Sequence, residues 1–426
     1  MNDIFVPRVL VISFNCFLTT NSNGRTLMKL FENYPSEYLR QFYMSSDIPD
    51  YKNCSSYYRV TDEEAMKAFL GKKVGRVILP SEKKKSSFGK VYTYTKKNRD
   101  NQMLRYLRQK VWETGRWENK EFYQWIEEFG PEVIVLFSGN NAFIDKIAMK
   151  ISKKYAIPII LYNCEDYFLK SPKNRKVFTI INKVHCDRVF KKTAQKVAGV
   201  IYNCEKLKQS YSEYFDTSGS IVLMNSANAA FENIENADLS GDGVVYLGNV
   251  SVGREYSLCE IADVLGERGM KLDVYGNISL SADKQKLLSN KNVSYHGCVS
   301  YEECCHIMQS SKLLIHCESF AKNRMRDIKH AFSTKIADSL ASGICLFVYA
   351  PENIALTDYI GKTQSAVLVT HREELRKKLF EALDSEELRK HTVERALKIV
   401  KQNHSQKRTS ELFVQFLCNV IKAERD

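Results

Sequence analysis

Residues 311–349 constrain the fold of this chain most, because they have the pattern strand, loop, helix, glycine, strand. Residues 313–317 form an apolar run typical of a buried strand, and a polar, basic loop follows. A short helix is expected over about 333–342, ended by Gly343, and residues 344–349 are the next apolar run. A βαβ unit of this kind predicts neighbouring parallel strands.

The expected helix over 333–342 has two different sides. Ile336 and Leu340 share one side of a helical wheel, and Thr334 and Asp338 share the opposite one. The apolar side should pack on the sheet, which leaves the polar side near the strand ends, where ligands of open α/β sheets bind. The preceding loop adds four basic residues, Lys322, Arg324, Arg326 and Lys329. The segment fits either a nucleotide-diphosphate site at a helix N-terminus or an ordinary crossover helix beside a solvated basic loop.

The alternation of apolar runs with helical stretches recurs from residue 8 onwards. Fully apolar strands between helices predict parallel sheets covered on both faces. A polar stretch without a strong period, residues 225–243, separates two such series. We therefore expect an α/β fold with two Rossmann-like domains, at residues 1–218 and 219–404, and a C-terminal helix over 405–426 that packs back on the first domain.

The composition is that of a globular protein, with 44% hydrophobic and 27% charged residues among 426. No apolar run is long enough to span a membrane, and the first residues lack the basic region and cleavage site of a signal peptide. The twelve cysteines are scattered without metal-ligand spacing. These features predict reduced, mostly buried thiols, no metal site and a cytoplasmic location.

The net charge of +13 is concentrated in residues 72–120, which contain fifteen Lys or Arg against four acidic residues. Trp112 and Trp117 lie in this segment, and Trp125 follows it. Basic residues interleaved with aromatic ones suit an anionic membrane surface or a lipid phosphate. They also suit nucleic acid, and a plain solvated loop and helix face would have the same composition.

Several catalytic motifs are missing from the sequence. It contains no GxSxG, no HExxH, no phosphate-binding GxxxxGK[ST] loop and no GxGxxG fingerprint. A glycine-containing turn does follow the first expected strand of the second domain, from Gly248 to Gly253, and Arg254 comes next. An arginine there could place its guanidinium on a phosphate, or the turn could be a simple connection between strand and helix.

Six segments between residues 244 and 360 together resemble the C-terminal, donor-binding domain of the GT-B glycosyltransferases. The likeness is greatest to the family 4 type of capsule, exopolysaccharide and lipopolysaccharide biosynthesis. The segments are VVYLGNVSVGRE, LDVYGN, VSYHGCVSYEEC, SKLLIHCESF, FSTKIADSLASG and FVYAPENIAL. Their order and spacing follow the family pattern. In the first half, weaker similarity covers a strand and polar turn ending in Gly24, and a strand running into Glu165 and Asp166.

The resemblance implies roles for residues of the second domain. Asp338 takes the place of the family's ribose-binding Glu, the second of two separated by seven residues. His330 takes the place of the first, which touches the donor sugar. Arg254 is the expected basic residue beside the diphosphate, with Lys335 as a second candidate. Three residues, Phe332, Ser333 and Thr334, occupy the loop whose backbone N–H groups meet the diphosphate, and Gly248 lies in the turn after the first strand.

The same resemblance implies a retaining, metal-independent glycosyltransferase in cell-surface polysaccharide biosynthesis. It would use a nucleotide-diphosphate sugar as donor, no other cofactor, and a hydroxyl of a lipid-linked or polysaccharide acceptor. Glu165 would orient that hydroxyl or only cap a turn, and Gly24 keeps one of the family's first-turn glycines. His330 would bond the sugar or a phosphate, or be solvated.

The basic segment, residues 72–125, gains a meaning from the resemblance as well. It would dock on the anionic inner face of the plasma membrane, which we favour over nucleic-acid binding. Two alternatives have the same architecture: a nucleotide-sugar epimerase, and a non-catalytic protein that binds a nucleotide sugar or RNA.

Overall fold

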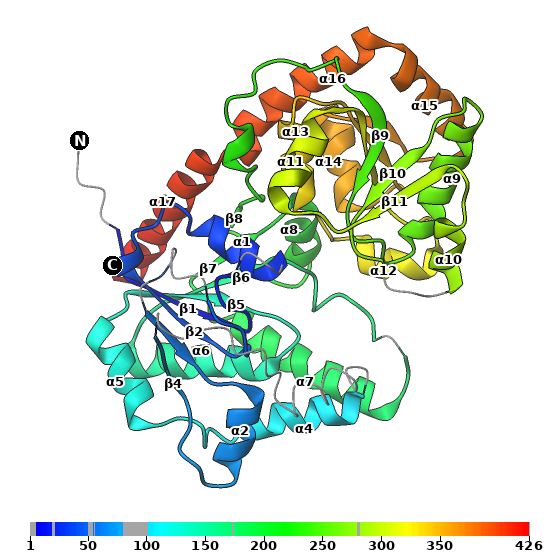
Figure 1. Cartoon of the computed structure of the whole chain (residues 1–426). Helices are drawn as coiled ribbons and strands as arrows, with labels where there is room; N and C mark the ends of the chain where they lie inside the picture. The colour runs from blue at the N-terminus through cyan, green and yellow to red at the C-terminus, as the bar shows by residue number, and fades with distance from the viewer. Residues whose placement is uncertain are drawn as a thin grey trace, which may run out of the picture. The chain divides into compact units, whose positions relative to one another are not determined.

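The computed structural model describes residues 6–18, 22–49, 54, 56–79, 101–172, 174–278 and 282–425. The chain divides into two compact units, each built on one β-sheet (Figure 1). Unit 1 comprises the residues up to Asn203, Leu207–Leu223 and those from Thr409 onwards, and unit 2 comprises Cys204–Lys206 and Met224–Arg408. The sequence predicted domain boundaries after residues 218 and 404. The nearest points at which the chain passes from one unit to the other come after residues 223 and 408.

The unit 1 sheet has the strand order β4-β3-β2-β1-β5-β6-β7-β8. Its strands are β1 Val9–Ser13, β2 Leu39–Tyr43, β3 Ser56–Arg59, β4 Arg76–Ile78, β5 Val133–Phe137, β6 Ile159–Asn163, β7 Gly199–Tyr202 and β8 Ser220–Val222. All neighbours are parallel except the edge pair, because β4 runs antiparallel to β3. The sequence analysis missed β4, whose three residues include an exposed Arg76 and carry no alternating pattern.

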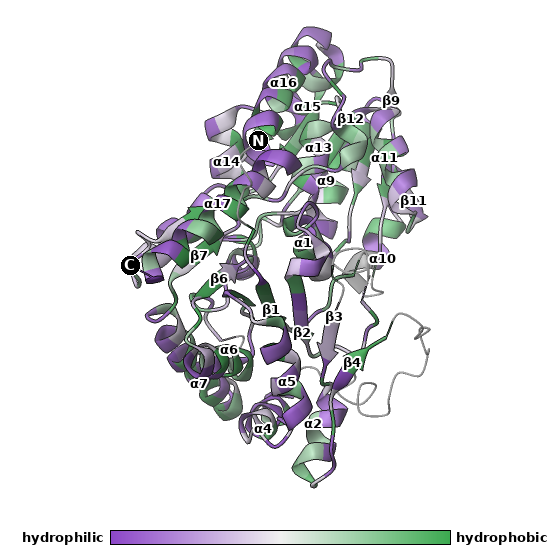
Figure 2. Ribbon diagram, turned by 90° about the vertical axis from the view of Figure 1, so that its left-hand side faces the viewer, coloured by the Kyte–Doolittle hydropathy of each residue, from purple (hydrophilic) through white to green (hydrophobic). Residues whose placement is uncertain are grey.

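Helices cover both faces of this sheet. They are α1 Ser22–Leu30, α2 Asp62–Phe69, α4 Gln102–Glu113, α5 Lys120–Phe129, α6 Ala142–Tyr155, α7 Val177–Ala194, α8 Glu205–Ser212 and α17 Gln406–Arg425. Figure 1 shows α1 and α17 on one face and α5, α6 and α7 on the other. In Figure 2 the strands β1 and β6 are green along their length, as expected for strands buried on both faces.

The C-terminal helix α17 packs on unit 1, as the sequence predicts. Its buried side chains Phe413 and Leu417 belong to the same core cluster as Phe31, which directly follows α1. The rings of Phe31 and Phe413 meet edge to face at 5.0 Å. β7 has a glycine, Gly199, where it contacts α17. A Cβ at this position would lie 2.8 Å from the ring of Phe416, which is too close for a larger residue. The prediction of two helix-covered α/β domains with this returning helix is confirmed.

The three tryptophans are buried in unit 1, so the expectation that they form an exposed basic and aromatic face is wrong. Trp112 stacks on Phe143 with ring centroids 4.8 Å apart, and Trp117 stacks on Phe42 at 5.3 Å. Trp112 Nε1 donates to an Asp62 carboxylate oxygen at 2.8 Å, which satisfies a polar group that burial would otherwise leave unpaired. The indoles of this segment therefore build the core and do not reach a membrane.

The unit 2 sheet is parallel throughout, with the order β11-β10-β9-β12-β13-β14. Its strands are β9 Asp242–Leu247, β10 Leu272–Tyr275, β11 Val293–Gly297, β12 Ser311–Cys317, β13 Leu346–Tyr349 and β14 Val367–Val369. Its helices are α9 Arg254–Gly266, α10 Ala282–Leu288, α11 Tyr301–Gln309, α12 Met325–Ile328, α13 Lys335–Ala341, α14 Ala355–Thr363, α15 Leu375–Asp384 and α16 Glu386–Ile399, and a π-helix, Val400–His404, precedes α17.

The βαβ pattern predicted for residues 311–349 is present as β12, α13 and β13, and β12 and β13 are parallel neighbours. Ile336 and Leu340 are fully buried on one side of α13, which fits the predicted packing. Asp338, expected on the polar side, is 6% exposed because protein groups surround it as well. Among the described residues, no helix has the length and apolar character needed to cross a membrane.

Candidate functional site

The switch point of the unit 2 sheet lies between β9 and β12. The chain adds β10 and β11 beyond β9, then crosses to the other side and adds β12, β13 and β14. Open α/β sheets bind ligands outside the carboxyl ends of their strands at such a point. Here β9 leads into residues 248–253 and then into α9, which begins at Arg254, while β12 is followed at once by Glu318.

Arg254 and Glu318 form a two-pronged ion pair at this switch point. Arg254 Nη2 lies 2.6 Å from Glu318 Oε1, and Arg254 Nε lies 3.0 Å from Oε2. Arg254 Nε also donates to the backbone oxygen of Cys317 at 3.1 Å, and Ser257 donates its hydroxyl to the Glu318 carbonyl at 2.8 Å. Planar fork geometry of this kind fixes the guanidinium in one orientation. The Arg254 side chain remains 19% exposed, against 6% for Glu318.

Each partner of this pair holds the other in its charged form. Burial lowers the pKa of Arg254, but the Glu318 carboxylate outweighs burial and raises that pKa above its ordinary value. Burial raises the pKa of Glu318, but the Arg254 guanidinium reverses the effect and lowers that pKa. His316 Nε2 lies 3.3 Å from Glu318 Oε1. Burial lowers the pKa of His316 despite this carboxylate, so the imidazole is neutral at physiological pH.

Lys335, the first residue of α13, brings a second cation to the same place. A Cβ on Gly248 would lie 3.0 Å from Lys335 Nζ and 2.9 Å from the Tyr246 hydroxyl, so the ammonium lies at the turn after β9. Lys335 and Arg254 both contribute to the lowered pKa of His316, so both cations act on the same imidazole. We call Arg254, His316, Glu318 and Lys335 the charged cluster.

The loop before α13 contributes backbone more than side chains. The Ser333 hydroxyl accepts a long hydrogen bond from the Lys335 N–H at 3.4 Å. The Thr334 side chain makes no such bond, although Thr334 is the N-cap residue of α13. Ser333 therefore caps the Lys335 N–H at the start of α13.

Asp338 lies one turn into α13 and accepts hydrogen bonds on both carboxylate oxygens. Oδ1 accepts from the backbone N–H of Asn228 at 2.9 Å, and Oδ2 accepts from the Tyr301 hydroxyl at 2.7 Å. Lys335 and Asp338 are three residues apart and so occupy neighbouring places on one side of the helix. A ligand hydroxyl that reached Oδ2 would compete with the Tyr301 hydroxyl.

Phe332 and His330 line a different part of unit 2. The Phe332 ring meets the Tyr359 ring edge to face at 5.2 Å, and it stacks at 6.5 Å on the ring of His404. His330 is 5% exposed, and its backbone oxygen accepts from the Cys204 thiol at 3.7 Å. The alternative that His330 is solvated is therefore wrong, because neighbouring side chains enclose it.

The carboxyl ends of the unit 1 strands around their own switch point, between β1 and β5, carry polar groups and the cation Arg108, which is paired with Asp62. Gln41 Nε2 donates to the Ser13 hydroxyl at 2.9 Å and to the Asn15 carbonyl at 3.1 Å, and Gln41 Oε1 accepts from the Phe17 N–H. This buried amide fixes the turn that follows β1. Gly24, from the same first strand-to-helix connection, is buried within α1.

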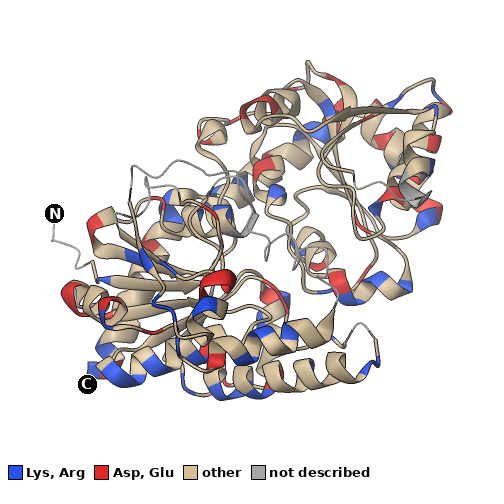
Figure 3. Cartoon of the chain, turned by 60° about the horizontal axis from the view of Figure 1, so that its bottom comes forward, with Lys and Arg blue, Asp and Glu red and all other residues tan. Residues whose placement is uncertain are grey.

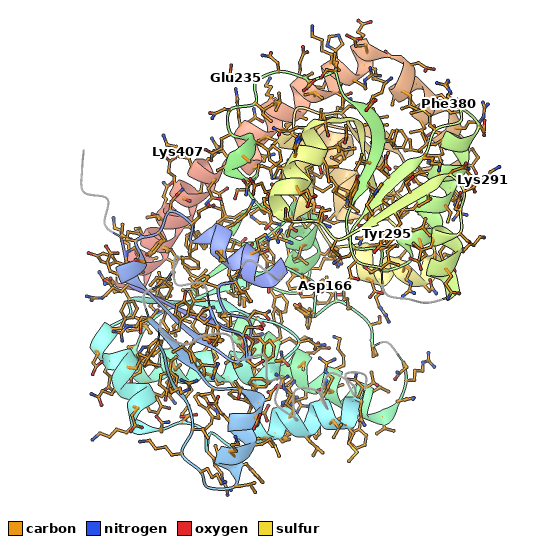
Figure 4. All side chains as sticks on the ribbon, in the orientation of Figure 1. Asp166, Glu235, Lys291, Tyr295, Phe380 and Lys407 are labelled. Atoms are coloured by element: carbon orange, nitrogen blue, oxygen red, sulfur yellow. The ribbon has the colours of Figure 1, made fainter. Side chains whose placement is uncertain are left out.

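Glu165 and Asp166 follow β6 and differ sharply in environment. Glu165 is exposed, whereas Asp166 is 3% exposed. Asp166 Oδ1 accepts from the Leu169 N–H at 2.8 Å and from the Tyr211 hydroxyl at 3.1 Å. Figure 4 labels Asp166, whose contacts are those of a residue that caps its own turn. Glu165 keeps its carboxylate at the surface.

The structure groups some of the sequence-predicted residues and separates others. Gly248, Arg254 and Lys335 meet at the switch point of unit 2, with Asp338 on α13 and Ser333 and Thr334 just before that helix. The Phe332 ring packs instead on Tyr359, His330 is buried, and Gly24 and Glu165 belong to unit 1. Sequence reasoning missed Glu318, His316 and Tyr301. The sequence did contain a signal for Glu318. This carboxylate directly follows the strand 313–317, and the basic residue Arg254 follows the first strand of the same domain.

Comparison with known proteins now identifies the region that contains this cluster. Residues 254–415 match the family model described as "Glycosyl transferase-like". The match begins at Arg254 and contains Glu318, Lys335 and Asp338. It covers less than half of the chain, and no curated protein sequence matches the chain significantly.

Solved structures extend the likeness to almost the whole chain. Anabaena HepE in complex with UDP and glucose has a TM-score of 0.62 and 11% identity, over 97% of this chain and 100% of that one. Sucrose-phosphate synthase from Thermosynechococcus elongatus has 0.61 and 11%, over 97% and 99%. An E. coli trehalose-6-phosphate protein bound with UDP-2-fluoro glucose has 0.60 and 9%, over 97% and 99%. The fold of this chain is therefore that of the GT-B glycosyltransferases.

Proposed function

We propose that the protein transfers a sugar from a UDP-sugar, or a related nucleotide-diphosphate sugar, to a hydroxyl of a lipid-linked or polysaccharide acceptor. The observation that carries this proposal is the charged cluster, where Arg254 and Lys335 converge at the switch point of unit 2. Proteins of the same fold have been crystallised with UDP, with UDP-glucose and with UDP-2-fluoro glucose. The family 4 type, with a retaining and metal-independent reaction in cell-surface polysaccharide biosynthesis, is part of the proposal.

The charged cluster supplies what such a reaction demands of the protein. When the bond between the sugar and the diphosphate breaks, negative charge develops on the leaving diphosphate. Fixed cations aimed at that charge stabilise the transition state without reorganising. Arg254 is already fixed by Glu318, and the partly exposed guanidinium can bind a phosphate oxygen. Arg254, Lys335 and Glu318 together carry one net positive charge, which leaves the cluster attractive to an anion.

The nucleoside end of the donor would lie along α13. In this proposal Asp338 accepts a ribose hydroxyl in place of the Tyr301 hydroxyl on Oδ2, and the N–H groups of 333–335 approach the diphosphate. An aspartate reaches one methylene less far than the glutamate of the family pattern, so the ribose must come closer to the helix. His330, enclosed beside Cys204, would act on the sugar only after a local rearrangement, and we assign it no chemical step.

The acceptor would come from unit 1, where Glu165 presents an exposed carboxylate after β6. A carboxylate there can accept the proton of a sugar hydroxyl and orient its oxygen. We propose that the acceptor is lipid-linked and that the protein works at the inner face of the plasma membrane, with surface cations of residues 72–125 near anionic lipids. Three consecutive lysines of this segment would be candidates for such a contact. They are Lys83, Lys84 and Lys85, and they lie outside the described residues.

A thermal-shift screen followed by a turnover assay tests the proposal. UDP- and GDP-sugars are added to wild type, to Asp338→Ala and to a matched control, Asp358→Ala, whose carboxylate forms a surface ion pair with Lys206. The preferred donor at a hundred times its Kd should raise the melting temperature by roughly 5–10 °C. Asp338→Ala should lose most of that shift and Asp358→Ala should keep it. If no nucleotide sugar shifts the melting temperature or is turned over, the proposed function is wrong.

A further inference from the structure

One side of helix α7 is apolar and exposed. Five of its residues are between 38% and 68% exposed: Val177, Phe178, Ile180, Ile181 and Val184. The buried side chains of the helix, which include Cys186, Val189 and Phe190, lie on the opposite side. A surface helix of a globular protein normally has one apolar stripe, facing the core. α7 therefore has a second apolar stripe that its own unit does not cover.

Cations continue this stripe along the same side of the helix. Positions 177, 181, 184, 188 and 191 follow the spacing that places residues on one side of an α-helix. The last two are Arg188 and Lys191, and Lys192 lies beside them; all three are exposed. The single carboxylate of α7, Asp187, is bound by Lys183 at 2.5 Å. Within the described part of the chain, Arg188 and Lys192 face no carboxylate.

Helix α4 of the basic segment packs beside α7 and widens the apolar area (Figure 1). Met103 and Leu107 of α4 are 46% and 45% exposed. The only carboxylate of α4, Glu113, is held by Lys110, Lys146 and His185. Figure 3 marks the Lys and Arg residues in blue and the few acidic residues in red. The α4–α7 surface, defined as these seven apolar residues with Arg188, Lys191 and Lys192, is thus both apolar and positively charged.

We propose that the α4–α7 surface docks on an anionic lipid membrane. Apolar side chains flanked by Lys and Arg match the boundary between acyl chains and anionic headgroups. A second copy of the chain is a poor occupant, since the same surface would bring only Asp187 and Glu113, carboxylates that are already bound, to Arg188 and Lys192. A protein partner is less suited too, because protein interfaces are depleted in Lys. The surface deepens the proposed function, since it explains how a lipid-linked acceptor is met.

Vesicle sedimentation tests this proposal with the full chain. Phosphatidylcholine vesicles with and without phosphatidylglycerol are incubated with wild type, with Ile181→Ser/Val184→Ser and with Arg188→Gln/Lys192→Gln. Matched controls in unit 2 are Tyr256→Ser, at a side chain 43% exposed, and Lys377→Gln, at an exposed lysine. Melting temperatures check that each variant is folded. We expect all of them to fold, because the substituted side chains are at the surface.

Wild type should bind the anionic vesicles, and salt should weaken the binding. Partitioning should fall about tenfold for the apolar double variant. It should fall about fivefold for each cation removed. Both controls should bind as wild type does. Binding that is absent, or unchanged in both α7 variants, overturns the proposal. So does a wild-type dimer that the apolar variant makes monomeric without any vesicle binding.

Donor turnover without vesicles separates this proposal from the proposed function. The α7 variants leave the charged cluster intact, so their turnover of a soluble nucleotide sugar should equal that of wild type. Lost vesicle binding with normal turnover supports docking at this surface, whereas vesicle binding without any turnover leaves docking standing and removes the enzymatic proposal.

Discussion

The two sheets present different chemistry at their carboxyl ends. Unit 2 gathers charge there: Arg254, Glu318 and Lys335 lie around its switch point. Unit 1 has a mixed set there: the Gln41 amide, the Ser13 hydroxyl and the exposed carboxylate of Glu165, which follows β6. A diphosphate needs fixed cations, and a sugar hydroxyl needs acceptors and shape more than charge. The difference therefore supports a division of labour in which unit 2 binds the donor and unit 1 the acceptor.

Buried carboxylates show the same contrast in a simpler form. Glu318 of unit 2 is 5% exposed and stays ionised because Arg254 lowers its pKa in spite of burial. Asp145 of unit 1 is 2% exposed and has only the Ser138 and Thr193 hydroxyls as partners, so burial raises its pKa to about 7. The partner decides the charge of a carboxylate that water cannot reach.

The largest expected effect is that of removing the charge of Glu318. Glu318→Gln would leave the Arg254 guanidinium buried without its counter-charge, which should cost about 3–5 kcal/mol of stability. Glu267→Gln is the matched control, because Glu267 pairs with Arg376 at the surface and should cost about 1 kcal/mol at most. Urea unfolding of each variant measures the difference. Equal costs would show that the pair is not a buried one.

Removing Arg254 should lower turnover, and it should also reduce stability because Glu318 is left buried without its counter-charge. Arg254→Ala takes away a cation placed for the leaving diphosphate, and losing one such group lowers kcat by about 10²–10³-fold. The matched control is Arg268→Ala, since Arg268 also pairs with a carboxylate, Asp384, but at the surface of unit 2. Release of UDP from the donor is the readout. Turnover within twofold or so of wild type would place the leaving group elsewhere.

The neutral carboxylate of unit 1 should make stability depend on pH. The folded-state pKa of Asp145, about 7, lies above its ordinary value of 3.8, so the folded state holds a proton that the unfolded state releases. Stability from this group is full below pH 3.8 and falls by about 1.4 kcal/mol per pH unit until about pH 7. Asp145→Asn should remove this slope from the unfolding free energy of unit 1. An unchanged slope would mean that Asp145 is ionised throughout.

The sequence predicted the parts of the fold that depend on local pattern. The apolar runs 313–317 and 344–349 became β12 and β13, each within two residues of its predicted bounds. The switch-point pairing of β9 with β12 could not be read in this way, because it joins strands far apart in the chain. Tertiary contacts also decided the tryptophans: charged neighbours in sequence suggested exposure, whereas Phe42 and Phe143 from other elements bury them.

The candidate site was predicted in outline only. The resemblance pointed to Arg254 and Lys335, whose convergence depends on the order of strands in the sheet. The resemblance assigned no role to Glu318, because this carboxylate acts on Arg254 only once folding has brought the two side chains together. It could not foresee that Tyr301 and Asn228 occupy the oxygens of Asp338, because those partners lie 37 and 110 residues away.

Hydrogen exchange with and without UDP tests the division of labour most directly. UDP contains the diphosphate but no sugar, so it should bind to unit 2 alone. Backbone amides of residues 247–254, 317–319 and 333–338 should exchange more slowly when UDP is bound, and those of residues 13–18 and 138–141 in unit 1 should not change. Protection confined to the unit 1 strand ends, or no protection at saturating UDP, would contradict the assignment of the donor to the charged cluster.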